Sequence, residues 1–433
     1  MARGLLIRAR RRTMLGLVLT AGGARGAYQA GVLKRLGELP ALRRSPSPFQ
    51  IVTGASAGAI NGATIASRSD DFGAATQSLA KLWAELQVHN VFKNDAVSLG
   101  MNGLRLLQDL ALGGLIGQPG MQSLLNAEPL RRYLTQHLNL EGVGEAIRKG
   151  HLFAAAITAT SYHSGKSFIF IEGRPGHPLW AKSRRVTLSV RLTIDHILAS
   201  AAIPIVFQPV LVRSEVGDFY FGDGGLRLVT PFSPAIRLGA DRVFGIGVRC
   251  QQSADDLSNT ELVARRDEKP IMAKPPLSQI CGVFLNAIFL DHLDTDFDHL
   301  QRMNQLIRAH ASAAPETATG DAVSEPMRTI EPMIVSPSED LAIVAKTLAY
   351  KMPRLVRFLM DGLGTPDAQS ADLMSYLLFD SSYTSALIDI GYRDAGKRID
   401  EIETFLFGSA RSNGSNVRLM KSRKRSALEA QQI

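Results

Sequence analysis

Two short apolar runs near the N-terminus are each followed by a turn of small residues and then by a helical pattern. The first run, residues 15–20, has the character of a buried strand, and residues 27–39 after it keep helical periodicity up to Pro40. The second run, residues 49–53, leads through another small-residue turn into a helix at 57–67. Strands that alternate with helices in this way are typical of α/β proteins. The order therefore predicts an α/β fold with a central, mainly parallel sheet.

Later segments add to both kinds of element. Further strands are predicted at residues 153–160, 167–171, 243–248 and 333–335. Further helices are predicted at residues 75–86, at 129–138, and over much of 336–407. Polar stretches at 251–279 and 309–324 are expected to be loops, and the glycine-broken apolar stretch between 91 and 125 is a candidate cover over a pocket.

Composition excludes several classes of function. The two cysteines, Cys250 and Cys281, are too few for a disulfide framework or a cysteine-based metal site. We therefore expect a reducing compartment, no metal and no cofactor. No aromatic residues interleave with the basic runs and no nucleic-acid motif is present, so a nucleic-acid partner is not expected.

The chain carries 49 basic and 40 acidic residues, a net charge of +9, and much of the excess lies near its two ends. The terminal basic residues are Arg8, Arg10, Arg11, Arg12, Lys421, Arg423, Lys424 and Arg425. Two interpretations remain open. The ends contact anionic lipid head groups, or they are solvated tails that keep the protein in solution.

The N-terminal segment imitates a secretory signal peptide, with basic residues before a short apolar run at 14–19. We reject this interpretation because cleavage near residues 24–27 would destroy a glycine-rich loop with a chemical use. No uninterrupted apolar run reaches the roughly 18 to 20 residues that a membrane-spanning helix requires. The protein is therefore expected to be cytoplasmic, with peripheral contact to an anionic membrane left open.

The turn after the second predicted strand is Gly54-Ala55-Ser56-Ala57-Gly58, a G-x-S-x-G pattern. In one use of this pattern, the glycines let a strand reverse into a helix so sharply that the serine hydroxyl projects outward. The pattern alone is weak in a chain with 38 glycines, and Ser56 could also be a small residue in an ordinary turn. A nucleophilic serine needs a base within hydrogen-bond reach and N–H donors for the oxyanion that forms after attack. The sequence must therefore supply both.

The turn after the first predicted strand is the candidate for the N–H donors. Residues 21–26, Ala-Gly-Gly-Ala-Arg-Gly, carry so little side chain that consecutive N–H groups can face one oxygen, at the positive end of the following helix. A dinucleotide-binding fingerprint is a rival interpretation, but Ala21 occupies its first glycine position and no acidic residue follows at the required spacing. A plain tight turn is the other alternative. The presence of the second motif favours an oxyanion loop.

Asp223 is the better candidate for the base, because the glycines around it let a carboxylate approach the serine closely. An Asp-Gly pair is also common in hairpin turns. The α/β-hydrolases use a histidine instead, but their nucleophile follows several strands and Ser56 follows only two. The histidines considered are His163, His177, His196, His292 and His299, and each is expected to be structural or on the surface.

Four motifs taken together resemble those of the patatin-like phospholipases. They are residues 22–33 (GGARGAYQAGVL), 54–58 (GASAG), 199–209 (ASAAIPIVFQP) and 223–225 (DGG), and they occur in the order of that family over roughly residues 14–250. Residues 285–291 (LNAIFLD) and 375–380 (SYLLFD) are similar to a longer bacterial branch. The resemblance implies a three-layer α/β/α sandwich with a helical C-terminal extension. It also implies a serine hydrolase that cleaves carboxylic esters of phospholipids or lysophospholipids through a Ser-Asp dyad and an acyl-enzyme, without calcium or histidine.

Carried over residue by residue, the resemblance makes Ser56 the nucleophile and Asp223 the base. Gly22, Gly23 and Ala24 would supply the oxyanion amides, and Arg25 matches the basic residue that completes this loop. The supporting glycines of the motifs are Gly26, Gly54, Gly58, Gly224 and Gly225.

Ala21 departs from the family, which commonly opens this loop with three glycines. Alanine would cost about 1 kcal/mol if the position needed a positive φ, and nothing if it ended the strand. Residues 200–204 are expected to pack against the floor of the site in a structural role.

Substrate is expected to enter over an apolar surface supplied by residues 91–125 and 341–360. The second segment carries four basic residues beside Leu355, Phe358 and Leu359, so it either lies on anionic lipid or packs on the core with a solvated basic face. A catalytically silent lipid-binding or regulatory protein on the same scaffold is the alternative function.

The expected organisation has five parts. These are a basic N-terminal tail (1–13), a catalytic domain (14–250), its loop-interrupted continuation (251–335), a helical C-terminal region (336–408) and a basic tail expected to be disordered (409–433).

Overall fold

A computed structural model describes most of the chain, and the strands it describes form one sheet. The described residues are 13–92, 125–182, 184–204, 206–214, 217–250, 292–313, 328–351 and 374–408. Within them, the strands are β1 (Leu15–Leu19), β2 (Ile51–Ala55), β3 (Ala154–Ser161), β4 (Ser167–Gly173), β5 (Ala181–Lys182), β6 (Arg185–Ser189), β7 (Val210–Ser214), β8 (Gly217–Gly222), β9 (Arg242–Ile246) and β10 (Glu331–Val335). Their order is β10-β9-β1-β2-β3-β4-β6-β5, and the β7–β8 hairpin joins the end of β3.

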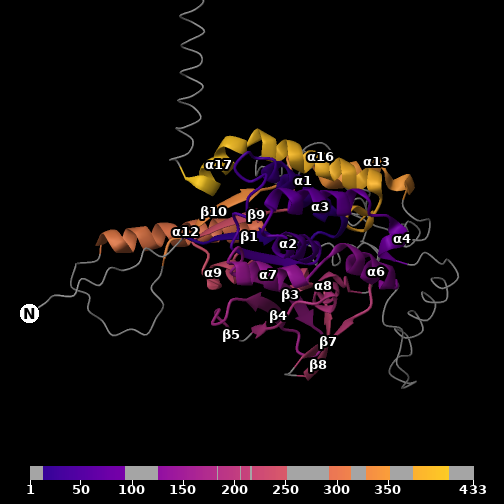
Figure 1. Cartoon of the computed structure of the whole chain (residues 1–433), viewed down its shortest axis with the longest axis horizontal. Helices are drawn as coiled ribbons and strands as arrows, with labels where there is room; N and C mark the ends of the chain where they lie inside the picture. The colour runs from indigo at the N-terminus through magenta and orange to yellow at the C-terminus, as the bar shows by residue number, and fades with distance from the viewer. Residues whose placement is uncertain are drawn as a thin grey trace, which may run out of the picture.

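Helices lie on both faces of this sheet (Figure 1). The α-helices are α1 (Gly26–Gly37), α2 (Ala57–Ser67), α3 (Phe72–Ala84), α4 (Val88–Val91), α6 (Glu128–His137), α7 (Glu141–Lys149), α8 (Ile194–Ala201), α9 (Ser233–Arg237), α12 (Leu293–Ala313), α13 (Leu341–Thr347), α16 (Ser381–Lys397) and α17 (Ile399–Phe407). The 3-10 helices are η1 (Gly23–Arg25), η2 (Gly224–Arg227) and η3 (Ala349–Lys351).

The five strands β10, β9, β1, β2 and β3 are parallel to one another. Leu19, at the end of β1, lies opposite Gly54 in β2, and Gly54 lies opposite Ile157 in β3. Because parallel strands end at the same edge of a sheet, the loops after β1, β2 and β3 are brought together there. This edge receives both glycine-rich turns of the sequence.

Side chains of the sheet alternate between two apolar cores. In β1, Leu15, Leu17 and Leu19 join the large core shared with helices such as α1, α2 and α3, whereas Val18 joins a smaller core with Phe232 and residues of α9 and α12. An alternation of two residues is what a strand covered on both faces requires. The result is the three-layer α/β/α arrangement that the family resemblance implied.

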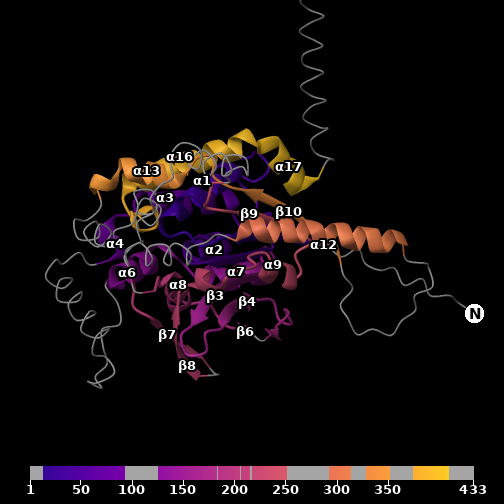
Figure 2. The ribbon, with the colours of Figure 1, turned by 180° about the vertical axis from the view of Figure 1, so that it is seen from behind.

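The C-terminal helix α16 lies beside the N-terminal helix α1 in both views of the molecule (Figures 1 and 2). The two helices approach closely because each has a glycine at the contact. A Cβ atom at Gly31 would overlap the carbonyl oxygen of Ile388, and one at Gly391 would overlap that of Tyr28. Helix α16, near the end of the chain, therefore packs directly on the helix that follows the first glycine-rich turn.

The predicted fold class is confirmed, and the predicted elements of the described chain are present with small shifts at their ends. The first glycine-rich turn is more regular than predicted, because η1 occupies Gly23–Arg25 and α1 begins at Gly26. Among the described helices, none is long and apolar enough to cross a membrane.

Several predictions fall partly or wholly outside the described residues. They concern both basic tails, most of the apolar stretch 91–125, the predicted loop 251–279, residues 314–324 of the second predicted loop, the segment 285–291, and residues 352–360 of the proposed lipid-facing segment. The loop prediction for residues 309–313 is wrong, because they continue the helix α12. The domain boundaries stay a prediction.

Candidate active site

Ser56 lies on the turn between β2 and α2, in a conformation that few serines adopt. Its φ is 54° and its ψ is −123°, and among the described residues it is the one non-glycine residue with a positive φ. Such a conformation costs on the order of 1–3 kcal/mol and persists only where the surroundings enforce it. The strand therefore reverses into the helix at Ser56 itself, as a nucleophile turn requires.

The glycines on either side of Ser56 allow this turn to be so tight. A Cβ atom at Gly54 would overlap the carbonyl oxygen of Gly58, and one at Gly58 would overlap that of Leu19 at the end of β1. Both positions thus require glycine because neighbouring backbone atoms occupy the space of a side chain, and not because the backbone needs a positive φ there. The same contacts place the N-terminus of α2 against β1.

Asp223 follows β8 and meets Ser56 at this edge of the sheet. The hydroxyl of Ser56 donates to Oδ2 of Asp223 at 2.6 Å, and the N–H of Gly225 donates to Oδ1 at 2.7 Å. The backbone of Asp223 is fixed as well, because its N–H donates to the carbonyl of Ala202 at 2.8 Å and its carbonyl accepts from Thr160 Oγ1 at 2.8 Å. Two residues 167 positions apart in the chain are therefore in hydrogen-bond contact.

The environment of Asp223 makes its carboxylate a better base than a solvated one. Only 3% of the residue is exposed, and this burial raises the pKa of Asp223 to about 6, although the hydrogen bonds from Ser56 and Gly225 lower it in part. Loss of hydration disfavours the charged form of a carboxylate. A pKa close to neutral suits a group that must both take and return a proton.

Ser200, at the end of α8, fixes the strained turn from the other side. Its Oγ accepts the N–H of Ser56 at 2.9 Å and donates to the carbonyl of Thr158 in β3 at 2.6 Å. The side chain is fully buried. The sequence predicted a structural role for residues 200–204 but not this contact; its one signal was the small-residue motif around Ser200.

The first glycine-rich loop begins extended and then turns. Gly22 is extended, with φ at −175°, and Gly23 has a φ of 53°, in the left-handed region that favours glycine. Ala21 has no positive φ, so alanine there causes no backbone strain, and its methyl group faces Gly225 beside Asp223. Alanine therefore fits at position 21, where the family commonly has glycine.

The N–H groups of Gly23 and Ala24 precede the first hydrogen bond of this turn, in which Arg25 N–H donates to the carbonyl of Gly22 at 3.0 Å. The first N–H groups of a helical turn lack acceptors within it and suit an anion. The N–H of Arg25 is already used inside the turn and is not available to an oxyanion. A role for Arg25 in this site must therefore come from its side chain.

A buried chain of amides lies beneath both turns. Trp83 Nε1 donates to Asn61 at 2.6 Å, Asn61 donates to Gln29 at 2.8 Å, and Gln29 donates to the carbonyls of Thr20 and Ile246 at 3.1 Å. It links α2 to α1 and to the end of β1. Sequence reasoning missed these residues, since amides in helices carry no recognisable spacing.

The histidines are held elsewhere. His196 is buried, meets the Phe170 ring edge to face and is hydrogen-bonded to Thr193, and its burial lowers its pKa to about 4. His163 stacks on Phe219, and His299 lies on α12, on the opposite face of the sheet. In the described part of the chain, Ser56 Oγ bonds to Asp223 and to no histidine, and no cluster of three metal-ligating side chains is found.

The fold and this site define an α/β/α protein with a serine on a strained turn beside a buried carboxylate. The model of the patatin-like phospholipase family matches residues 17–236, just over half of the chain. The chain therefore belongs to the patatin-like phospholipase family. No curated protein sequence matches it significantly.

Solved structures with a related arrangement come from bacterial and human proteins. VipD from Legionella pneumophila is 13% identical with a TM-score of 0.34, over 90% of this chain and 67% of its own. Human GIVD cytosolic phospholipase A2 is 12% identical with a TM-score of 0.40, over 91% of this chain and 60% of its own. ExoU of Pseudomonas aeruginosa, in its complex with SpcU, is 14% identical with a TM-score of 0.25, over 96% and 83%. These scores are too low to carry an argument about function.

Proposed function

We propose that this protein cleaves carboxylic esters of phospholipids or lysophospholipids with Ser56 as nucleophile and Asp223 as base. The hydrogen bond of 2.6 Å from Ser56 Oγ to Asp223 Oδ2, made by a serine held on a strained turn, carries this proposal. Backbone strain at a residue whose side chain is hydrogen-bonded to a base is characteristic of sites where geometry is selected for chemistry.

In the proposed reaction, Asp223 takes the proton of Ser56 as Oγ attacks the ester carbonyl. The N–H groups of Gly22, Gly23 and Ala24 stabilise the oxyanion of the tetrahedral intermediate, and the positive end of α1 adds to their effect. Protonated Asp223 then returns the proton to the leaving alkoxide, so the alcohol departs and an acyl-enzyme remains. Asp223 next takes a proton from a water molecule that attacks the acyl group, and returning this proton to Ser56 Oγ releases the fatty acid.

A partly apolar cavity supports a substrate with a hydrocarbon chain. It has a volume of about 250 Å³ and lies between α6, α8 and the β7–β8 hairpin. Its apolar lining includes Leu130, Leu198, Phe207 and Val210, and its polar lining includes Glu128, Arg131 and Gln208. Ala202 also lines it, and the carbonyl of Ala202 accepts the N–H of Asp223. Cytoplasmic location and peripheral contact with an anionic membrane belong to the same proposal.

A lipid panel assayed with wild type, Ser56→Ala and Asp223→Asn tests the proposal, together with labelling by a fluorophosphonate. Wild type is expected to release fatty acid and to be labelled at Ser56, and both variants are expected to lose turnover while remaining folded. Asp218→Asn is the matched control, because Asp218 lies on the same hairpin in an exposed ion pair with Arg213. Substantial turnover by Ser56→Ala would contradict the proposal, and a folded wild type with neither label nor turnover would favour the silent lipid-binding alternative.

A further inference from the structure

Arg25 is a buried cation at the end of the oxyanion loop, and its partners come from the far end of the chain. Only 1% of the residue is exposed. Its Nε donates to Ser375 Oγ at 2.6 Å, and its guanidinium lies 4.3 Å from the centre of the Tyr376 ring. A guanidinium buried in this way depends on such contacts to offset its lost hydration. Arg25 therefore ties the loop to residues 350 positions away.

The backbone of Tyr376 contacts the same loop independently of Arg25. A Cβ atom at Gly23 would overlap the carbonyl oxygen of Tyr376, so this carbonyl lies directly on Gly23. Gly23 is also the residue with the left-handed φ of 53°. Its missing side chain is thus required both by the turn and by the contact with Tyr376.

Residues 374–379, here called the clamp segment, are held firmly enough to fix that loop. All six residues are buried. Asp380, directly after them, caps α16 by accepting the N–H of Ser382 at 2.9 Å. Since α16 packs on α1, and α1 begins where the oxyanion loop ends, the clamp segment has a fixed position relative to that loop.

We propose that Ser375 and Tyr376 are positioning residues for the oxyanion loop, acting through Arg25 and through the contact on Gly23. This inference rests on the proposed function and adds a requirement to it. The catalytic machinery extends beyond the matched region 17–236 and needs residues near the C-terminus. Loss of the Tyr376 ring or of the Ser375 hydroxyl removes a contact that offsets the lost hydration of Arg25, and the resulting shift of the Arg25 side chain displaces the N–H groups of the loop.

The test compares Tyr376→Leu, Tyr376→Phe and Ser375→Ala in the full chain. The assay measures kcat and KM for p-nitrophenyl butyrate between pH 5 and 9. Because small displacements of oxyanion donors reduce turnover strongly, Tyr376→Leu is expected to lower kcat by about 10- to 100-fold and Ser375→Ala by about 10-fold. KM is expected to change by less than about threefold. The acid limb of the pH profile is expected to stay near pH 6, the pKa of Asp223. Tyr376→Phe keeps the ring and is expected to recover kcat to within about threefold of wild type.

Ser382→Ala is the control, since Ser382 is exposed and lies just beyond the clamp segment. A kcat within twofold of wild type for folded Tyr376→Leu and Ser375→Ala would overturn the proposal, and so would a loss confined to KM. If Tyr376→Leu fails to fold, Ser375→Ala decides alone because it removes a single oxygen atom. Failure of the proposed function is a separate outcome, in which Ser56→Ala keeps its turnover whatever the clamp variants do.

Discussion

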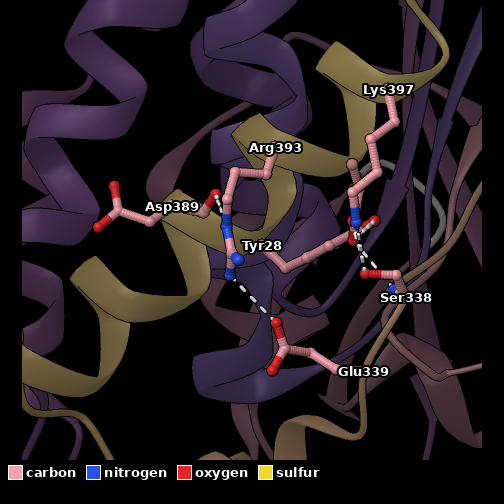
Figure 3. Close-up of polar contacts among 7 residues, drawn as sticks. Tyr28, Ser338, Glu339, Asp389, Arg393 and Lys397 are labelled. Carbon is pink, nitrogen blue, oxygen red and sulfur yellow. Dashed lines mark hydrogen bonds and ion pairs between the residues drawn. The ribbon is translucent and has the colours of Figure 1, made fainter.

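Two buried carboxylates, Asp223 and Asp394, have different hydrogen-bond partners. Asp223 accepts hydrogen bonds from the hydroxyl of Ser56 and the N–H of Gly225, both neutral donors. Asp394, on α16, accepts from Tyr28, from the N–H and hydroxyl of Ser338, and from the ammonium of Lys397. Figure 3 shows Tyr28, Ser338 and Lys397 approaching one another from α1, the segment before α13, and α16.

The difference separates a carboxylate suited to proton transfer from one suited to holding elements together. Asp223 has neutral partners, so burial leaves its negative charge poorly stabilised and its pKa is raised. Asp394 has four donors, one of them cationic, and they come from three elements. A charge-assisted network of this kind stabilises the packing of the elements that it joins.

The largest expected effect is on turnover when the poorly stabilised carboxylate is removed. Asp223→Asn is expected to lower kcat at least about 1,000-fold, since proton transfer and the activation of Ser56 are lost together. At pH 8 the same variant is expected to increase the free energy of unfolding by up to about 3 kcal/mol, which is the raised pKa of about 6 against 3.8 expressed as free energy. Ester hydrolysis and chemical denaturation measure the two effects. A variant that is both inactive and less stable would show that Asp223 is a structural residue like Asp394.

The sequence predicted that Asp223 meets Ser56, but it did not predict the hydrogen-bond network around Asp394. Ser56 and Asp223 are each flanked by glycines, because backbone atoms approach at Gly54, Gly58 and Gly224, and such local constraints leave a motif. Asp394 and its partner Tyr28 are ordinary helix residues whose relation depends on how α16 packs on α1. A contact between residues 366 positions apart leaves no spacing to recognise.

The first glycine-rich loop, residues 21–26, falls between these cases. Its glycines were recognisable as a turn after a strand, and Gly23 does have the left-handed φ that glycine permits. The support of this loop by Ser375 and Tyr376 could not be recognised in the sequence. Position 23 requires glycine partly because the carbonyl of Tyr376, from the other end of the chain, lies directly on it. Likewise, the parallel sheet followed from the alternation of strands and helices, whereas the return of α16 to α1 followed from no local pattern.

The pH dependence of turnover and of stability should have opposite signs if Asp223 is the base. The base must be deprotonated, so kcat/KM is expected to fall below a pH of about 6, approaching tenfold per pH unit. Stability should change the other way. Between about pH 4 and pH 6 the folded protein binds a proton at Asp223 that the unfolded chain has released, so this group lowers the free energy of unfolding as pH rises.

The difference between wild type and Asp223→Asn isolates this contribution, because all other titrations are shared. Denaturant unfolding at pH 4, 5, 6 and 8 should show the gap between the two proteins widening up to about pH 6 and then staying constant. A gap that is independent of pH, or an acid limb of kcat/KM well below pH 5, would remove Asp223 from the role of base.

A smaller effect is expected when the well-stabilised carboxylate is removed. Asp394→Asn replaces one of the two oxygens that accept these four donors with an amide NH2, which faces donors in place of an acceptor, so the free energy of unfolding is expected to fall by about 1–3 kcal/mol. Turnover is expected to stay within about threefold of wild type, since Asp394 contacts no reacting group. Asp389→Asn is the matched control, because Asp389 is exposed on the same helix, and it should change stability by less than about 0.5 kcal/mol. A loss of turnover as large as that of Asp223→Asn would contradict the distinction.

The smallest expected effect comes from removing single tyrosine hydroxyls. It tests whether burial or hydrogen-bond length determines how much a tyrosine–carboxylate hydrogen bond stabilises the protein. Tyr28 donates to Asp394 at 3.3 Å in the core, whereas Tyr392 donates to Glu38 at 2.6 Å in a partly exposed site on the same pair of helices. An exposed donor exchanges its partner for water at little cost, but a buried acceptor that loses a donor keeps its desolvation. Tyr28→Phe is therefore expected to lower the free energy of unfolding by about 1 kcal/mol and Tyr392→Phe by less than about 0.5 kcal/mol, despite the shorter bond of Tyr392. Urea denaturation of both variants measures the difference, and the reverse order would mean that the Asp394 network is looser than its burial indicates.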